Sequence, residues 1–215
     1  MADNTKITGN AEQIDNKKRT SHMESVRVFI VEDDKDFIFL MKKMLEKQPD
    51  ITVAGSCSRK EEAVQMACVL RPQIVIMDLN LGTSEMDGIH ISREIRLLTD
   101  AKVLILTSLD SPEIVLKAAK EAFASGYVFK NQPNLLVENI LALAKGYTAQ
   151  EYLIASMALS GLTEAEMGVF QILMGKDIRL QSSPKTIANQ KTKILKKLGL
   201  ESQRDLLHIF KLFRS

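Results

Sequence analysis

The stretch QIVIMD at residues 73–78 is a short apolar run, rich in β-branched residues, that ends abruptly in a carboxylate. Runs of this kind are typical of strands that are buried on both faces of a parallel sheet. Four more runs flank it along the chain, namely VRVFIV (26–31), ITVAG (51–55), AKVLILT (101–107) and GYVF (126–129). The sequence therefore predicts five buried strands.

Stretches with helical spacing of apolar residues alternate with these runs, at 37–47, 60–70, 89–98, 113–123 and 135–145. Prolines stand at the edges of the predicted elements, where they are tolerated. Alternation of strands and helices predicts a doubly wound parallel sheet, with helices on both faces because crossovers are right-handed. We expect an α/β domain with five strands in the flavodoxin-like order 2-1-3-4-5.

The composition excludes several classes of protein. The chain has 215 residues, of which 45% are hydrophobic and 26% charged, and no apolar run reaches the roughly 18 residues that span a bilayer. The polar N-terminus lacks the apolar core of a secretory signal. Two cysteines, Cys57 and Cys68, form neither a disulfide framework nor a four-ligand zinc site. We expect a cytoplasmic protein.

The net charge of +2 conceals an asymmetry. Residues 23–145 and 146–175 are both acidic, whereas residues 176–215 hold ten Lys and Arg against three acids. This asymmetry favours a polyanion-binding C-terminus, the alternative being an ordinary solvated helix surface.

Polar residues end or directly follow four of the predicted strands, at the edge where doubly wound sheets carry their functional crevice: Glu32, Asp33, Asp34, Asp78, Thr107 and Lys130. Singly, each has an ordinary explanation, such as a helix cap or a surface lysine. Jointly, crowded carboxylates require a proton or a cation among them. Oxygen ligands without sulfur or imidazole suit Mg²⁺, so we expect a magnesium site at Glu32, Asp33 and Asp78.

Four motifs in this order, VFIVEDD, IVIMDLNL, VLILTS and GYVFK, resemble the receiver domain of two-component response regulators over about residues 25–145. The resemblance implies that Asp78 accepts a phosphoryl group from a phosphohistidine of a sensor histidine kinase. It implies that Glu32 and Asp33 position Mg²⁺ together with Asp78 and the backbone carbonyl of Asn80.

The same resemblance implies that Thr107 bonds one phosphoryl oxygen, that Lys130 neutralises another, and that Tyr127 reorients with Thr107 on activation. One departure concerns the loop after the phosphoacceptor, LNLGTSEMDG, in which the Asp-Gly step comes about two residues later than usual. We therefore expect a longer loop beside the site.

Helical patterns continue after a linker. Thr163 and Glu166 form a predicted capping box, and Ser183-Pro184 starts a helix that Gly199 ends, with another helix from about residue 202. LTEAE (162–166), SPKTI (183–187) and ILKKLGL (194–200) resemble the LuxR-type helix-turn-helix of NarL/FixJ response regulators. The resemblance implies a homodimer when phosphorylated, and a 184–198 helix that contacts double-stranded DNA through Lys185, Thr186, Asn189, Thr192, Lys193 and Lys196.

The helix-turn-helix also departs from its family. Between Gly175 and Ser183 the chain is roughly six residues short, too few for the usual scaffold helix. Ala188 stands at a common lysine position and Lys191 at a usually apolar one. We expect four segments: a disordered extension (1–22) with a cloning-like His22-Met23 junction, a receiver domain (23–145), a linker (146–160) and a LuxR-type domain (161–215).

Two functions remain open at this stage. The first is a phosphorylation-controlled transcription factor, which the basic C-terminus favours. The second is a signalling protein whose C-terminal domain binds a protein partner, which the missing scaffold helix favours. A phosphohydrolase is the least favoured, because Asn80 stands where such an enzyme has its second catalytic Asp; we expect a regulator, not an enzyme.

Overall fold

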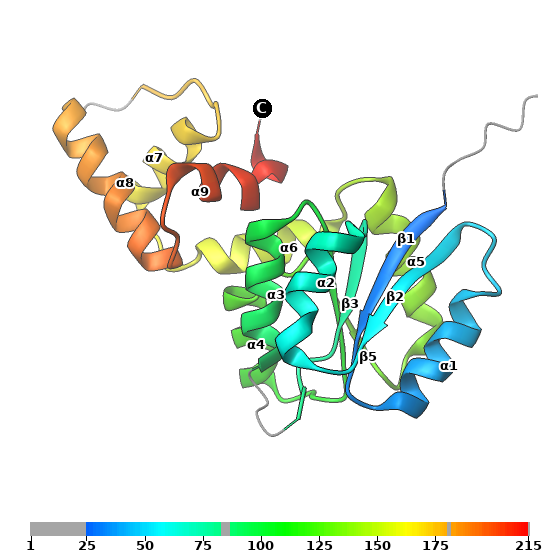
Figure 1. Cartoon of the computed structure of the whole chain (residues 1–215). Helices are drawn as coiled ribbons and strands as arrows, with labels where there is room; N and C mark the ends of the chain where they lie inside the picture. Colours follow the sequence, from blue (N-terminus) through cyan, green and yellow to red (C-terminus); the bar gives the residue numbers. More distant parts are fainter. Residues whose placement is uncertain (1–24, 83–86, 180–181, 215) are drawn as a thin grey trace, which may run out of the picture.

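The computed structural model describes residues 25–82, 87–179 and 182–214, so the predicted extension at 1–22 lies outside the described residues. Its centre is one parallel sheet in the order β2-β1-β3-β4-β5 (Figure 1). The strands are β1 (Val26–Val31), β2 (Ile51–Cys57), β3 (Ile74–Met77), β4 (Lys102–Thr107) and β5 (Gly126–Phe129). The doubly wound fold and the predicted strand order are confirmed.

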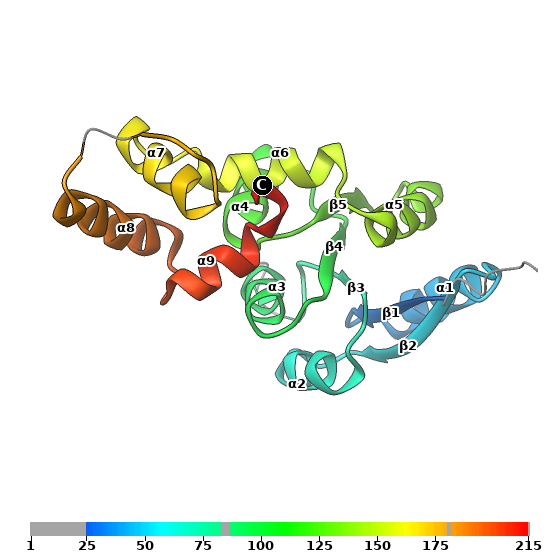
Figure 2. The ribbon, with the colours of Figure 1, turned by 90° about the horizontal axis from the view of Figure 1, so that it is seen from above.

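Helices cover both faces of the sheet (Figure 2). The helices α1 (Lys35–Leu45) and α5 (Pro133–Lys145) pack on one face, with Met41 and Ile140 in the shared core. The other face carries α2 (Lys60–Leu70), α3 (Asp87–Leu98) and α4 (Pro112–Glu121). Since both faces are covered, side chains of β1, β3 and β4 are almost completely buried, as their apolar runs predict.

Local capping residues set where the helices begin. The side chain of Asp34 accepts hydrogen bonds from the amides of Asp36 and Phe37, so α1 begins two residues before the predicted start at 37. Ser111 caps α4, with Pro112 as its first residue. Both predicted starts are late because apolar spacing begins only inside the first, polar turn.

The C-terminal half is helical and packs around a second apolar cluster. It consists of α6 (Ala149–Leu159), α7 (Glu164–Leu173), α8 (Pro184–Leu198), α9 (Gln203–Ile209) and the short 3₁₀ helix Lys211–Phe213. The predicted capping box of Thr163 and Glu166 and the Ser183 cap are present. Gly199, with φ +62°, ends α8 as expected. This helical region is consistent with a helix-turn-helix domain.

The connection between α7 and α8 is short. Its described residues, 174–179 and 182–183, contain no helix, and residues 180–181 lie outside the described part. The prediction that the scaffold helix is missing agrees with these residues. No helix in the described part of the chain has the length and apolar character needed to cross a membrane.

The C-terminal helices dock on the α3 side of the sheet. Phe123, which follows α4, belongs to the same apolar cluster as Phe170 and Phe210. Nε2 of His208 lies 2.9 Å from the carbonyl oxygen of Arg96, and Nζ of Lys211 donates to Asp100 at 2.9 Å. Polar and apolar contacts together therefore fix the two halves against each other.

Candidate phosphoacceptor and metal site

The predicted carboxylates meet at the carboxyl edge of the sheet. Because β1 and β3 are parallel neighbours, with Val31 opposite Met77, the next residues Glu32 and Asp78 lie side by side. One carboxylate oxygen from each of Glu32, Asp33 and Asp78 lies within 4.8 Å of the others. Glu32 and Asp78 are buried and Asp33 is exposed, so the cluster opens to solvent on one side.

Lys130 completes the site from the edge strand. It follows β5, and its Nζ lies 2.6 Å from Oε2 of Glu32 and 2.9 Å from Oδ2 of Asp78. Its two carboxylate partners outweigh the effect of burial and raise the pKa of the Lys130 ammonium above its usual value. Lys130 is therefore a fixed positive charge shared by two carboxylates.

Burial dominates the protonation of Glu32. Desolvation raises the pKa of this carboxyl from 4.5 to about 7, the Lys130 hydrogen bond opposes the shift, and the nearby Asp78 charge adds to it. A carboxyl of this kind releases its proton when a cation replaces it, which is the behaviour expected of a metal ligand.

One carboxylate oxygen of Asp78 is the strongest indication of a ligand site. Its Oδ2 accepts from Lys130, but its Oδ1 is buried without a hydrogen-bond partner among the described residues. A buried, unpaired carboxylate oxygen is costly unless a ligand or ion meets it. The unpaired oxygen and the all-oxygen donor set fit Mg²⁺, which prefers carboxylates, carbonyls and water.

The four carboxylates following the strands do not act alike. The side chain of Asp34 is used to cap α1, so for this residue the ordinary explanation holds. Oδ2 of Asp33 accepts from the amide of Gly82 at 2.9 Å, which ties it to the loop after Asp78. Asn80 lies on the same loop with an exposed side chain.

The Asp-Gly step, which comes about two residues later in the sequence than is usual in receivers, is Asp87-Gly88 and lies against the backbone of Asp78. The amide of Gly88 donates to the carbonyl oxygen of Leu79 at 3.1 Å, and a Cβ on Gly88 would overlap the backbone of Asp78 and Leu79. The start of α3 therefore packs directly on the backbone of Asp78 and Leu79. Of the longer loop predicted here, residues 83–86 lie outside the described part.

Thr107 and Tyr127 are linked on the other side of the site. Thr107 ends β4 and is fully buried, and its hydroxyl accepts from the amide of Leu109 at 3.3 Å. The hydroxyl of Tyr127 donates to the carbonyl of Leu109 at 3.0 Å. Burial raises the pKa of Tyr127 to about 12, so its hydroxyl stays a donor at neutral pH.

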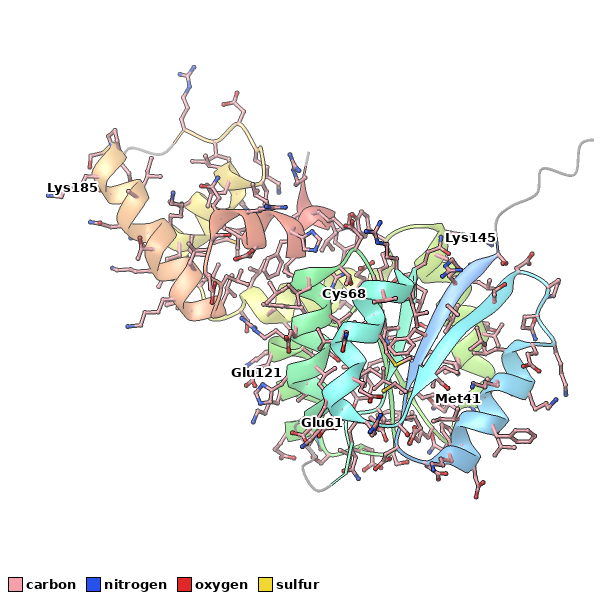
Figure 3. The ribbon with its side chains drawn as sticks, viewed as in Figure 1. Met41, Glu61, Cys68, Glu121, Lys145 and Lys185 are labelled. Carbon is pink, nitrogen blue, oxygen red and sulfur yellow. The ribbon has the colours of Figure 1, made fainter. Side chains whose placement is uncertain are left out.

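A second set of predicted residues lies together on α8. All six predicted DNA-contacting residues are exposed, and Lys185 lies at the end of α8 that is far from the sheet (Figure 3). Two hydroxyls in this set are already bonded locally, Thr186 to Ser183 and Thr192 to the carbonyl of Ala188. Lys191 is half-buried and its Nζ donates to Gln203 at 3.3 Å, so it belongs to the packing of α8 on α9.

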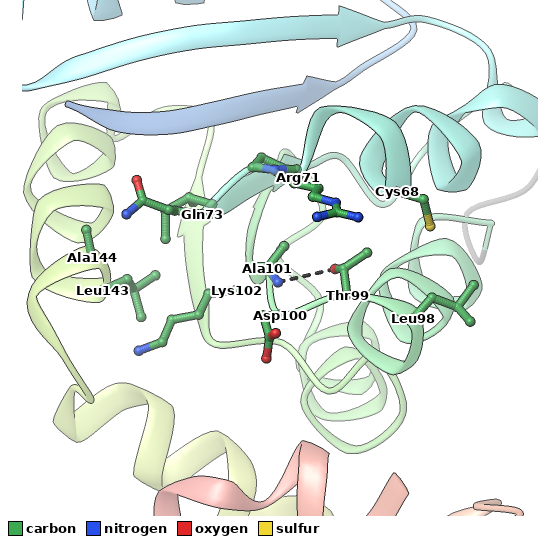
Figure 4. Close-up of a pocket in the computed structure, with 12 residues that line it drawn as sticks. Cys68, Arg71, Gln73, Leu98, Thr99, Asp100, Ala101, Lys102, Leu143 and Ala144 are labelled. Carbon is green, nitrogen blue, oxygen red and sulfur yellow. Dashed lines mark hydrogen bonds between the residues drawn. The ribbon is translucent and has the colours of Figure 1, made fainter. Parts of the chain in front are cut away.

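A large cavity lies away from this chemistry. It has a volume of about 720 Å³, and its lining includes Gln73 and Lys102, at the amino ends of β3 and β4 (Figure 4). Asp100 and Lys102, in its lining, also bind the C-terminal half through Lys211 and Glu151. Sequence reasoning missed these contacts, because no spacing along the chain marks them.

A carboxylate cluster with a shared lysine at the carboxyl edge of a 2-1-3-4-5 sheet defines a receiver. Residues 28–141, more than half of the chain, match the response regulator receiver domain family. The chain belongs to this family and is a response regulator of the NarL/FixJ type.

Named relatives extend the similarity beyond the receiver. The transcriptional regulatory protein LiaR of Bacillus subtilis is 34% identical over 139 residues, which is 64% of this chain and 64% of that protein. The DNA-binding transcriptional activator DevR/DosR of Mycobacterium tuberculosis is 29% identical over 197 residues, covering 82% and 89% of the two chains. Protein-glutamate methylesterases, which are enzymes, also match, over a smaller share of their length.

The fold has solved counterparts. The structure of a LuxR-family two-component response regulator from Aurantimonas has a TM-score of 0.54 and 32% identity, covering 63% of this chain and 96% of that one. The relatives are mainly transcriptional regulators.

Proposed function

We propose that this response regulator accepts a phosphoryl group on Asp78 from a sensor histidine kinase and uses it to control DNA binding and transcription. The observation that carries the proposal is the unpaired Oδ1 of Asp78, buried beside Lys130 and the carboxylates of Glu32 and Asp33. A nucleophile of this kind needs a free oxygen and nearby positive charge.

In the proposed transfer, a carboxylate oxygen of Asp78 forms a bond to phosphorus. The bond from phosphorus to the imidazole nitrogen of the kinase breaks, and that nitrogen keeps the electron pair. Charge on the equatorial phosphoryl oxygens is met by the Lys130 ammonium and by the Thr107 hydroxyl. Glu32, Asp33, Asp78 and the carbonyl of Asn80 would hold Mg²⁺, which supplies further neutralisation of that charge.

The phosphoacceptor assignment is tested with a small phosphodonor and Mg²⁺, reading the mass of the intact chain. We expect one phosphoryl group on the wild type, none on Asp78→Asn, and one on the control Asp34→Asn, whose carboxylate only caps α1. Labelling of Asp78→Asn with unchanged stoichiometry would overturn the assignment.

The DNA-binding part of the proposal rests on α8. Its exposed face carries Lys185, Lys193 and Lys196, which suit phosphate contacts, and Asn189, which suits an adenine edge. A homodimer formed on phosphorylation would pair two such helices on a near-palindromic site. A regulator of this kind acts in the cytoplasm and is not itself an enzyme.

One observation favours a second candidate, a C-terminal domain that binds a protein partner. The described residues between α7 and α8 contain no scaffold helix to support α8 on a DNA backbone. Selection from a random duplex pool with Mg²⁺ and beryllofluoride separates the candidates. We expect a half-site motif that the wild type enriches and Asp78→Ala does not; equal, salt-sensitive binding without a motif would favour the protein partner.

A further inference from the structure

One side chain of α6, that of Gln150, is hydrogen-bonded to the edge strand β5 of the sheet. The amide of Tyr127 donates to Oε1 of Gln150 at 3.2 Å, and Nε2 of Gln150 donates to the carbonyl of Tyr127 at 3.1 Å. Because β5 is an edge strand, these backbone groups face away from β4, where no strand pairs with them. We call this pair of bonds the Gln150 clamp.

Two neighbouring features show that the clamp is built into the packing. A Cβ on Gly126 would lie 3.0 Å from Oε1 of Gln150 and 2.8 Å from Cδ1 of Leu104, so the absence of a side chain lets the amide approach. Glu151, the next residue, is buried and accepts from Lys102 at 2.9 Å. The first turn of α6 is therefore held on both β4 and β5.

The clamp is the last step of a chain of contacts that begins at Thr107, at the carboxyl end of β4. The amide of Leu109 donates to the Thr107 hydroxyl at 3.3 Å, and the carbonyl of Leu109 accepts from the Tyr127 hydroxyl at 3.0 Å. The backbone amide and carbonyl of Tyr127 then form the two hydrogen bonds of the Gln150 clamp. These hydrogen bonds are joined through the backbone of Leu109 and the side chain of Tyr127, and both residues pack against the apolar core of that face.

The far end of α6 connects to the C-terminal helices. The chain runs from α6 into α7 after only a few residues. At the near end, two residues after Gln150, the hydroxyl of Tyr152 donates to the carbonyl of Leu212 at 3.1 Å. Leu159 of α6 lies in the same apolar cluster as Phe170 and Phe210. A displacement of α6 therefore displaces the helices that present α8.

We infer that Gln150 is a positioning residue that couples the state of the Asp78 site to the C-terminal helices through the backbone of Tyr127. The inference rests on the proposed phosphorylation of Asp78 and adds the route of its signal. When the Thr107 hydroxyl turns to a phosphoryl oxygen, the amide of Leu109 loses its acceptor. The segment around Leu109 and the Tyr127 side chain rearrange, and the clamp opens.

Coupling of this kind is reciprocal, which separates it from a merely structural contact. If the clamp stabilises the resting state, removing it must make the Asp78 site easier to occupy. A contact that only attaches α6 to the sheet would change the free energy of unfolding and leave the occupancy of the Asp78 site unchanged.

The test uses the full chain with Mg²⁺ and beryllofluoride, a phosphoryl mimic, and follows bound fluoride by fluorine NMR. The variant Gln150→Met keeps the size of the side chain and removes both bonds to Tyr127. The matched control is Ala149→Met, which adds the same side chain at the exposed neighbouring position of α6. Hydrogen exchange of β5 and α6 is measured on the same samples.

For Gln150→Met we expect half-saturation at a beryllofluoride concentration about fivefold or more below that of the wild type. We also expect exchange of the β5 and α6 amides to be about tenfold faster without beryllofluoride, since two hydrogen bonds are lost. In the wild type, beryllofluoride itself should produce the faster exchange. Ala149→Met should match the wild type throughout.

Half-saturation of Gln150→Met equal to that of the wild type would overturn the inference, as would α6 exchange that beryllofluoride leaves unchanged in the wild type. If Gln150→Met does not fold, Gln150→Glu retains an acceptor for the Tyr127 amide while lacking the donor to its carbonyl, and the wild-type exchange decides independently. Absence of bound fluoride in the wild type would instead count against the phosphoacceptor site, and would remove the signal that the clamp is inferred to carry.

Discussion

The Nζ atom of Lys130 lies 2.6 Å from Oε2 of Glu32, closer than its 2.9 Å approach to Oδ2 of Asp78. The lysine that we propose to neutralise a phosphoryl oxygen is thus held in advance by the acidic residue that we propose to hold the metal. Glu32 is almost completely buried, at 1% exposure, and makes its closest contact with this ammonium group. Charge and protonation at the site are therefore coupled through this pair.

The raised pKa of Glu32 predicts that stability depends on pH. Since the folded-state pKa rises from 4.5 to about 7, the native chain holds a proton that the unfolded chain releases between these pH values. The stabilisation is complete below pH 4.5 and is lost as the pH rises through about 7. We expect the free energy of unfolding to fall by about 1–3 kcal/mol across this window.

This dependence is measured by urea unfolding in the presence of a chelator. Glu32→Gln should flatten the curve in this window. Glu46→Gln, whose carboxylate is exposed beside Lys43, should leave it unchanged. An equal slope for Glu32→Gln and the wild type would assign the effect to another group.

Removal of the Lys130 ammonium leaves two neighbouring buried carboxyls without their cation. We expect Lys130→Met to lower the free energy of unfolding at neutral pH by about 2 kcal/mol, because a buried charge loses its partner. Labelling of Asp78 by a small phosphodonor should fall by at least about tenfold, the effect of one lost charge contact in the transition state. Lys43→Met removes an exposed lysine and serves as the control for both measurements. Unchanged labelling of Lys130→Met would contradict the assignment of Lys130 to the site.

The contact of Gly88 with the backbone of Asp78 and Leu79 predicts that alanine substitution will have very different effects at two glycines. A Cβ at Gly88 would lie 2.5 Å from the Cα of Leu79 and overlap the carbonyl of Asp78, whereas a Cβ at Gly161 has nothing within 4 Å. We expect Gly88→Ala to cost about 1–3 kcal/mol in thermal unfolding, since rigid backbone cannot yield easily. Gly161→Ala should be near neutral, and equal melting temperatures for the two variants would contradict the packing described.

The contacts of Arg93 predict that this residue holds the C-terminal helices against the sheet-bearing half of the chain. Its guanidinium donates to the carbonyls of Leu198 and Gly199 at 2.7 and 2.6 Å, and lies over the ring of Phe123 at 4.3 Å. We expect Arg93→Ala to expose these carbonyls and release the end of α8 from α3, which would increase the radius of gyration in small-angle X-ray scattering. Arg204→Ala, on the exposed side of α9, is the control; scattering curves that superimpose for both variants would count against a locking role of Arg93.

Much of the fold could be predicted from the sequence because its signals are local. Continuous apolar runs such as residues 74–77 predict buried strands. Capping residues such as Ser183, whose hydroxyl accepts from an amide only three residues away, predict where helices begin. The convergence of Asp78 and Lys130 followed from topology alone, because parallel strands end at one edge.

What the sequence alone determined is therefore the order of the elements, the sheet they form and the residues at its functional edge. Tertiary structure alone decided which partner each polar group takes. Lys130 pairs with Glu32 as well as Asp78, Gln150 clamps Tyr127, and Arg93 binds carbonyls more than a hundred residues away. These contacts join groups that are distant along the chain, and hydrogen bonding depends on position and direction in space, which no local spacing encodes.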